Sequence, residues 1–211
     1  RDGIVDQESV RVASSFKWTK GQSSVHVQER HVGIYGQWID TWRPGSDREI
    51  ALILEDDITV SPYAYVWLKT VHAKYDRLPD ISGYTLQSEG FFKANGGGGL
   101  VTPKNHVVFG YKLIGSWGFS PHHKWWSKFQ DWYHSTRKSN PEFRPYVPNA
   151  SVVTSWYKGF EKRKRNDTMW TMWFIKFSDQ NNLYCVYNNI RRFTGDVNTL
   201  LAVNRKERGL H

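Results

Sequence analysis

The feature that most constrains the fold is a short apolar run that ends directly in three acidic residues. Residues Ile50 to Leu54 read Ile-Ala-Leu-Ile-Leu, and Glu55, Asp56 and Asp57 follow at once. A continuous apolar run bounded by polar turns is typical of a strand that is buried on both faces of a sheet. The sequence therefore predicts an interior strand over 50–54 that presents three carboxylates at its carboxyl end.

Strand-like and helix-like patterns alternate along the rest of the chain. The predicted strands are 24–28, 81–86, 106–114 and 183–187, and the predicted helices are 33–42, 61–75, 168–177 and one that starts at Ser120-Pro121. Ser61-Pro62 supplies an N-cap and a first-turn proline. Alternation of this kind predicts one α/β domain over residues 1–211, with a mostly parallel mixed sheet flanked by helices.

The three carboxylates are the strongest candidate for chemistry. Open α/β sheets bind ligands at the carboxyl ends of their strands. Adjacent carboxylates repel one another unless a cation offsets their charge, and oxygen ligands suit Mg²⁺ or Mn²⁺, which usually bridge to substrate phosphates. The other interpretation is an acidic turn in solvent before a helix N-terminus, where negative charge is favourable.

Two features of the composition suggest further binding partners. The net charge of +9 is compatible with nucleic acid, anionic membranes or phosphorylated substrates. The most concentrated basic run, residues 158–165, reads as an exposed loop, and such runs are more often solvated than functional. The eleven tryptophans are expected to lie mostly in the core, with a few left to stack on sugar rings.

Several segments resemble the N-acetylglucosaminyltransferase I family. Residues 52–58 (LILEDDI), with the helix after Ser61-Pro62, resemble its strand–EDD–helix segment. Residues 115–119 (GSWGF) resemble the Gly-Leu-Gly-Trp segment that lines its donor-sugar pocket, and residues 126–132 are similar to its tryptophan-rich helix with an aspartate. Residues 33–189 also resemble a group of glycosyltransferase-like proteins.

The resemblance implies a GT-A-like (Rossmann-like) domain that uses a UDP-sugar donor and Mn²⁺ or Mg²⁺. Asp57 would be the direct metal ligand. Asp56 and Glu55 would contact the nucleotide or orient the metal's waters. Gly115, Trp117 and Gly118 would form the donor-sugar site, with Trp117 as its apolar floor, and the acceptor would be a glycan or glycoprotein.

The resemblance assigns the general base less specifically. Asp131 best matches the residue that takes the proton from the acceptor hydroxyl, which implies inversion at the anomeric carbon. The family has two acids before the tryptophan, whereas this chain has Gln130-Asp131-Trp132. Helical spacing turns Asp131 away from Phe129, toward either a cleft or solvent. Glu89, after the strand at 81–86, is the substitute base.

A second departure concerns the start of the fold. Glycosyltransferases of this type open with an apolar strand that holds the uracil, and no such strand precedes Ser24. We therefore expect the domain to lack its first strand. This leaves open a non-catalytic carbohydrate-binding or scaffold protein on a degenerate fold.

The alternative of a nucleic-acid-binding protein and the cellular location both rest on weaker signals. A basic nucleic-acid-binding module would rest on net charge alone, and no nucleic-acid-binding motif supports it. The sequons at Asn149 and Asn166 indicate a secretory setting, expected to be the Golgi lumen. No apolar run is long enough to span a membrane.

Overall fold

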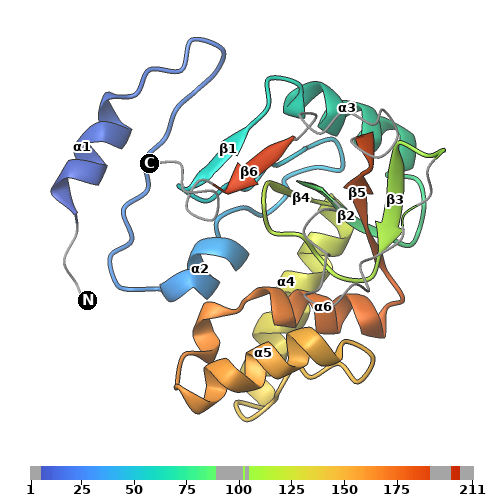
Figure 1. Cartoon of the computed structure of the whole chain (residues 1–211). Coiled ribbons are helices and arrows are strands. Elements are labelled where there is room, and N and C mark those ends of the chain that lie inside the picture. The colour runs from blue at the N-terminus through green and yellow to red at the C-terminus, as the bar shows by residue number, and fades with distance from the viewer. Residues whose placement is uncertain (1–5, 89–101, 103–104, 191–200, 205–211) are drawn as a thin grey trace.

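The computed structural model describes residues 6–88, 102, 105–190 and 201–204 (Figure 1). The helices are α1 (Gln7–Ser15), α2 (Gly33–Ile39), α3 (Ala64–Tyr75), α4 (His123–Ser139), α5 (Ser151–Lys162), the 3-10 turn η2 (Asn166–Thr168) and α6 (Thr171–Gln180). The strands are β1 (Ile58–Val60), β2 (Ile81–Ser88), β3 (Val108–Tyr111), β4 (Phe119–Pro121), β5 (Tyr184–Asn188) and β6 (Ala202–Asn204).

The larger sheet has four strands in the order β3-β5-β2-β4. The central strands β2 and β5 pair in parallel, whereas the edge strands β3 and β4 each run antiparallel to their neighbour. The prediction of an α/β domain is confirmed, but the prediction of a mostly parallel sheet was wrong. Apolar patterning indicates a strand without fixing its direction, and parallel neighbours need long crossover connections. Here only β2 and β5 are joined in that way.

A smaller sheet follows the acidic residues directly. Strand β1 pairs antiparallel with β6, with Ile58 opposite Asn204 and Val60 opposite Ala202. The Ser61 amide then donates to the Leu201 carbonyl at 2.8 Å. The chain that leaves Asp57 is therefore held by pairing with a distant segment.

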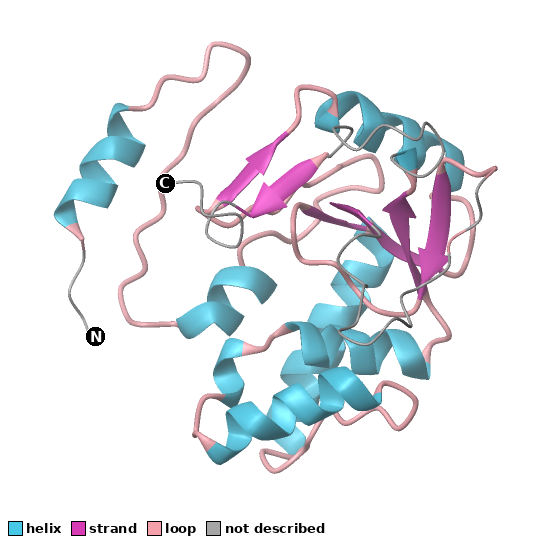
Figure 2. Cartoon of the chain, in the orientation of Figure 1, coloured by secondary structure: helices cyan, strands magenta, loops and turns pink. Residues whose placement is uncertain are grey.

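Helices cover both faces of the larger sheet (Figure 2). Helix α3 packs on one face through Leu68 and Val71, against Tyr84 and Leu86 of β2. Helices α2, α4 and α6 pack on the other face, against β4 and β5. Helix α5 packs mainly on α6, through a separate small cluster.

The core between the sheet and the α4–α6 layer is aromatic. Trp126 and Phe129 of α4 meet Trp173 and Phe174 of α6, and all four side chains are buried. The Phe129 and Phe174 rings meet edge to face, with centroids 5.0 Å apart. Such pairs add to the stabilisation from burial. The tryptophans are mostly core residues, as predicted, and two of the described ones, Trp18 and Trp156, are largely exposed.

The predicted interior strand at 50–54 was wrong. The segment makes a single isolated bridge, between Ile53 and Phe119 of β4, and Ile50 and Leu54 are 45% and 43% exposed. Leu52 and Ile53 do pack against the two core clusters. The apolar run reflects this packing, while most of its backbone makes no strand ladder.

Two local predictions were also wrong. Residues 24–28 pair with no strand, and Val25 and Val27 are exposed, because no described segment offers them a partner. Ser120-Pro121 ends β4, and the helix begins two residues later at His123. Ser61-Pro62 likewise precedes its helix, which begins at Ala64.

Candidate functional site

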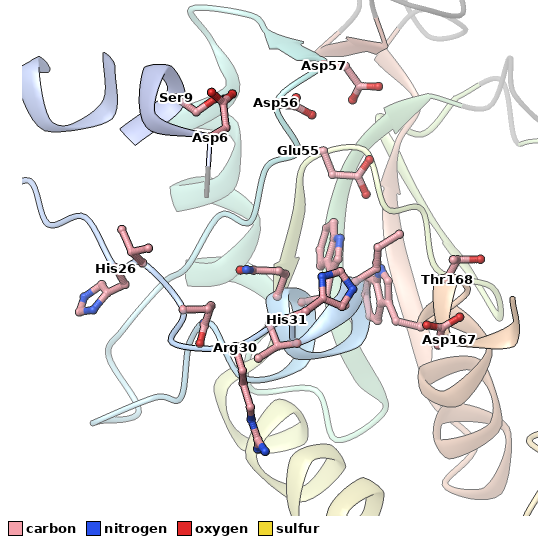
Figure 3. A pocket seen from close by; sticks show the side chains of 18 of the residues that line it. Asp6, Ser9, His26, Arg30, His31, Glu55, Asp56, Asp57, Asp167 and Thr168 are labelled. Atoms are coloured by element: carbon pink, nitrogen blue, oxygen red, sulfur yellow. The ribbon is translucent and has the colours of Figure 1, made fainter. Parts of the chain in front are cut away.

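The acidic residues border an open pocket with a volume of about 1150 Å³. One wall is the N-terminal arm, residues 6–32, which includes α1 and lies beside the body of the domain (Figure 1). The opposite wall comes from α2 and from the segment around η2. Figure 3 shows Glu55, Asp56 and Asp57 along one side of the pocket, with His31 and Asp167 further down.

Anchors on both sides fix the acidic turn. Before it, the Ile53 amide donates to the Phe119 carbonyl at 2.9 Å. Within it, the Ile58 amide donates to the Glu55 carbonyl at 3.2 Å, and β1 begins at Ile58. Glu55 and Asp57 are partly buried and Asp56 is exposed. The acidic turn therefore borders the pocket, and a bridge and a turn hold it rather than a buried strand.

The GSWGF segment reaches the same pocket through Ser116. Gly115, Trp117 and Gly118 are not among the described lining residues. Trp117 is partly buried and packs against the α3-side core, and its carbonyl accepts a hydrogen bond from the Thr85 hydroxyl at 3.4 Å. The structure therefore brings Glu55–Asp57 together with Ser116.

Packing within the domain explains both glycines of this segment. A Cβ atom on Gly115 would lie 2.7 Å from Gln87 Oε1 and 2.8 Å from Thr85 Oγ1. Gly118 has a φ of +65°, and a Cβ there would lie 2.7 Å from Leu86 Cδ1. Only glycine satisfies both the left-handed backbone and the close approach at Gly118.

The pocket is acidic although the chain is basic. The described lining residues include six carboxylates, Asp6, Glu29, Glu55, Asp56, Asp57 and Asp167, but only one arginine, Arg30, besides His26 and His31. Such a lining favours a cation over a free anion. A diphosphate would meet repulsion here unless a cation accompanied it.

The donor chemistry of the acidic turn fits a hard divalent ion. Among the described residues, no group of three or more His, Cys, Asp or Glu side chains is arranged to hold a metal. Mg²⁺ does not require such a cage, because it is commonly held by one or two carboxylates together with water and substrate phosphates. Asp57 and Asp56 can supply those two carboxylates.

The two predicted bases lie elsewhere. Asp131 is on the outer face of α4, where its side chain is 65% exposed and pairs with Arg43 at 2.7 Å. It is not among the described lining residues, so of the two expected orientations the structure has the one toward solvent. Glu89 lies outside the described residues.

Two pocket residues were not singled out from the sequence. A Cβ on Gly33 would lie 3.9 Å from both Asp167 Oδ2 and His31 Nε2, so these two groups flank the start of α2. In the sequence, Asp167 is recognisable only as the middle residue of a glycosylation sequon that could also cap a helix. His31 lies in a segment without apolar periodicity, so its sequence does not predict a place at the pocket.

A buried hydrogen-bond chain connects α3 to the segment before the acidic turn. Asp76 accepts from His72 Nδ1 at 3.0 Å and from the Tyr84 hydroxyl at 2.7 Å. His72 Nε2 lies 2.8 Å from Ser120 Oγ, and that hydroxyl donates to the Ala51 carbonyl. Burial would raise the pKa of Asp76, but the hydrogen bonds from His72 and Tyr84 outweigh it and hold that pKa below its usual value.

Comparison with known proteins gives one relationship. The family model of the SPBC1E8.03c C-terminal domain matches residues 2–143, a range that contains the acidic turn, the GSWGF segment and α4. No curated protein and no solved structure matches the chain. Because the match covers well over half of the sequence, the chain belongs to the SPBC1E8.03c C-terminal domain family.

Proposed function

We propose that this chain is a metal-dependent glycosyltransferase that moves a sugar from a UDP-sugar donor to a hydroxyl of a glycan or glycoprotein. One observation carries the proposal. Glu55–Asp57 and Ser116, which belong to segments that resemble the nucleotide and donor-sugar segments of glycosyltransferases, border a single pocket. A GT-A-like domain in the Golgi lumen is part of the same proposal.

The size of the pocket supports a large ligand. Typical small-molecule pockets have volumes of roughly 300–1,000 Å³. The volume here, about 1150 Å³, leaves room for a nucleotide sugar and part of an acceptor.

The charge of the pocket supports metal dependence. Asp57 and Asp56 would hold Mn²⁺ or Mg²⁺, and Glu55 would accept hydrogen bonds from the nucleotide. The bound ion would supply positive charge that stabilises the diphosphate as it leaves. Without that charge, the lining carboxylates would oppose the diphosphate.

Proton transfer from the acceptor needs a base at the pocket. Asp131 remains a proposal on resemblance alone, since Arg43 pairs with it outside the pocket lining. Asp167 and His31 line the pocket and are the alternatives that the geometry favours. Either one would take the proton as the acceptor oxygen attacks the anomeric carbon on the face opposite the diphosphate.

Calorimetric titration with UDP, with and without Mn²⁺, tests the proposal. We expect binding that requires Mn²⁺ and weakens at least about tenfold in Asp57→Asn, because Asn keeps the size but removes the charge that holds the ion. Asp47→Asn is the matched control, because Asp47 is exposed and outside the described lining. If the parent protein binds no UDP, or if Asp57→Asn binds it equally well, the proposal is wrong.

A turnover assay separates the enzyme from the alternative. The parent protein is incubated with a panel of UDP-sugars and Mn²⁺, and release of UDP is followed with and without glycan acceptors. Release that needs Asp57 supports the transferase. Binding of UDP-sugars without any release would favour the non-catalytic carbohydrate-binding alternative.

A further inference from the structure

Helix α5 exposes an apolar stripe beside its core contacts. Val153 and Tyr157 are buried against α6, whereas Val152 and Trp156 are 60% and 54% exposed. Val152 and Trp156 are four residues apart, so they lie on one face of the helix, and Gly159 continues that face. A tryptophan left this exposed on a regular helix has no internal packing role that explains it.

Basic side chains follow the same stripe at its C-terminal end. The cations are Lys162, Arg163, Lys164 and Arg165, and all four are exposed. The acid next to them, Glu161, is turned inward, where it pairs with Arg144 and accepts from the Tyr146 hydroxyl. It therefore does little to offset the positive charge outside.

The sequence predicted an exposed loop over residues 158–165, but residues 158–162 belong to helix α5. Helix α5 continues to Lys162, and only the last three cations lie beyond it. Arg163 reaches back toward the apolar stripe, because a Cβ on Gly159 would lie 3.8 Å from Arg163 Nη1. A cation therefore lies beside the stripe.

We propose that this basic-aromatic face of α5 (Val152, Trp156, Lys162–Arg165) docks on an anionic phospholipid bilayer. Trp156 and Val152 enter the boundary between headgroups and acyl chains, where Trp is favoured. The cations meet the negative lipid phosphates. No helix among the described residues is long and apolar enough to cross a bilayer.

The apolar component favours a bilayer over nucleic acid. Trp156 could stack on a base, but Val152 has no ring and stands exposed on the same stripe. Burial of an aliphatic side chain beside cations is the pattern of an interfacial helix. The inference stands independently of the proposed transferase activity, because no residue of this face lines the acidic pocket.

Vesicle co-sedimentation of the whole chain tests this docking surface. We expect binding to vesicles of phosphatidylcholine with phosphatidylserine, little binding to phosphatidylcholine alone, and loss of binding at high salt. Lys162→Glu/Lys164→Glu should weaken binding by about 25-fold or more, since each cation near an anionic surface contributes roughly a factor of five. Trp156→Ala should weaken it about tenfold.

Two matched variants serve as controls. Lys17→Glu/Lys20→Glu on the exposed N-terminal arm changes the net charge equally, and Trp18→Ala removes a tryptophan that is also 54% exposed. Both should bind vesicles like the parent. Equal losses in the control and α5 variants, or no dependence on phosphatidylserine, would overturn the proposal. Binding of a poly-uridine RNA through the α5 face, without vesicle binding, would also overturn it.

Discussion

Replacement of Gly118 by alanine tests whether the GSWGF segment owes its glycine to packing or to a ligand. Gly118 has a φ of +65°, and its carbonyl accepts from the Leu86 amide at 3.0 Å. A Cβ on Gly118 would lie 2.7 Å from Leu86 Cδ1 and 3.1 Å from Leu86 Cβ. Leu86 is fully buried in β2, so it has little room to retreat.

The expected loss of stability has two parts. A left-handed backbone costs a non-glycine residue about 1–2 kcal/mol. Insertion of a methyl group into a packed core costs about 1–3 kcal/mol. Their sum is of the order of 3 kcal/mol, which should lower the melting temperature of a domain of this size by about 6–12 °C.

Gly110→Ala is the matched control. Gly110 lies in β3, is exposed, and a Cβ there would lie 3.6 Å from the nearest atom, Tyr184 Cβ, an ordinary contact. Alanine should leave the melting temperature unchanged or raise it slightly, because it restricts the unfolded chain. Thermal melts followed by circular dichroism measure both variants. A Gly118→Ala protein that melts with the parent but no longer binds UDP-sugar would refute the packing argument.

Two further predictions concern Trp117 and Asp76. Trp117→Ala should remain folded and lower the free energy of unfolding by about 1–2 kcal/mol, below the roughly 3–5 kcal/mol of a core tryptophan, because Trp117 is only partly buried against the α3-side core; collapse of the thermal melt would mark Trp117 as core. Asp76→Asn should lower the free energy of unfolding at neutral pH by about 2–4 kcal/mol, measured with urea, because it removes the partner of His72. The folded-state pKa of Asp76 is lowered, so this difference should hold above its usual pKa of 3.8 and shrink as the pH falls through the lower folded value. A constant difference from neutral to acid pH would contradict the role of the Asp76 charge.

The elements that pack in the core could be predicted from sequence, because burial leaves a pattern. Helix α3 and strand β2 match the predicted ranges 61–75 and 81–86 within a few residues. Strand β5 likewise matches 183–187, and its Cys185 is buried. In each case apolar spacing and boundary residues agree with the tertiary packing.

The apolar run before the acids shows where this reasoning stops. Leu52 and Ile53 are apolar because they pack on the two core clusters, which a strand would also require. Whether the backbone forms a ladder depends on which distant edge is free to pair. Strand β4 offers it only one bridge, at Phe119. No local pattern encodes that outcome.

The pocket was predictable only in part, for a similar reason. Three adjacent acids are visible in a sequence, and their place at the end of an apolar run indicated a site. The other wall is an arm whose helix α1 has no buried residue, so no buried apolar face indicates where it packs. His31 and Asp167 meet there only because α2 and η2 pack together.

Charge is arranged unevenly over this chain, and the two proposed sites use opposite signs. Six carboxylates gather in the described lining of the pocket, although the whole chain carries a net charge of +9. The positive charge must therefore lie mainly elsewhere, and four exposed cations lie on the α5 face. A diphosphate that approached the chain without a metal ion would be drawn to the basic surface rather than to the pocket. Because a bound ion reverses the sign of the local field at the acidic turn, the metal would determine where the donor binds as well as how its phosphates are stabilised.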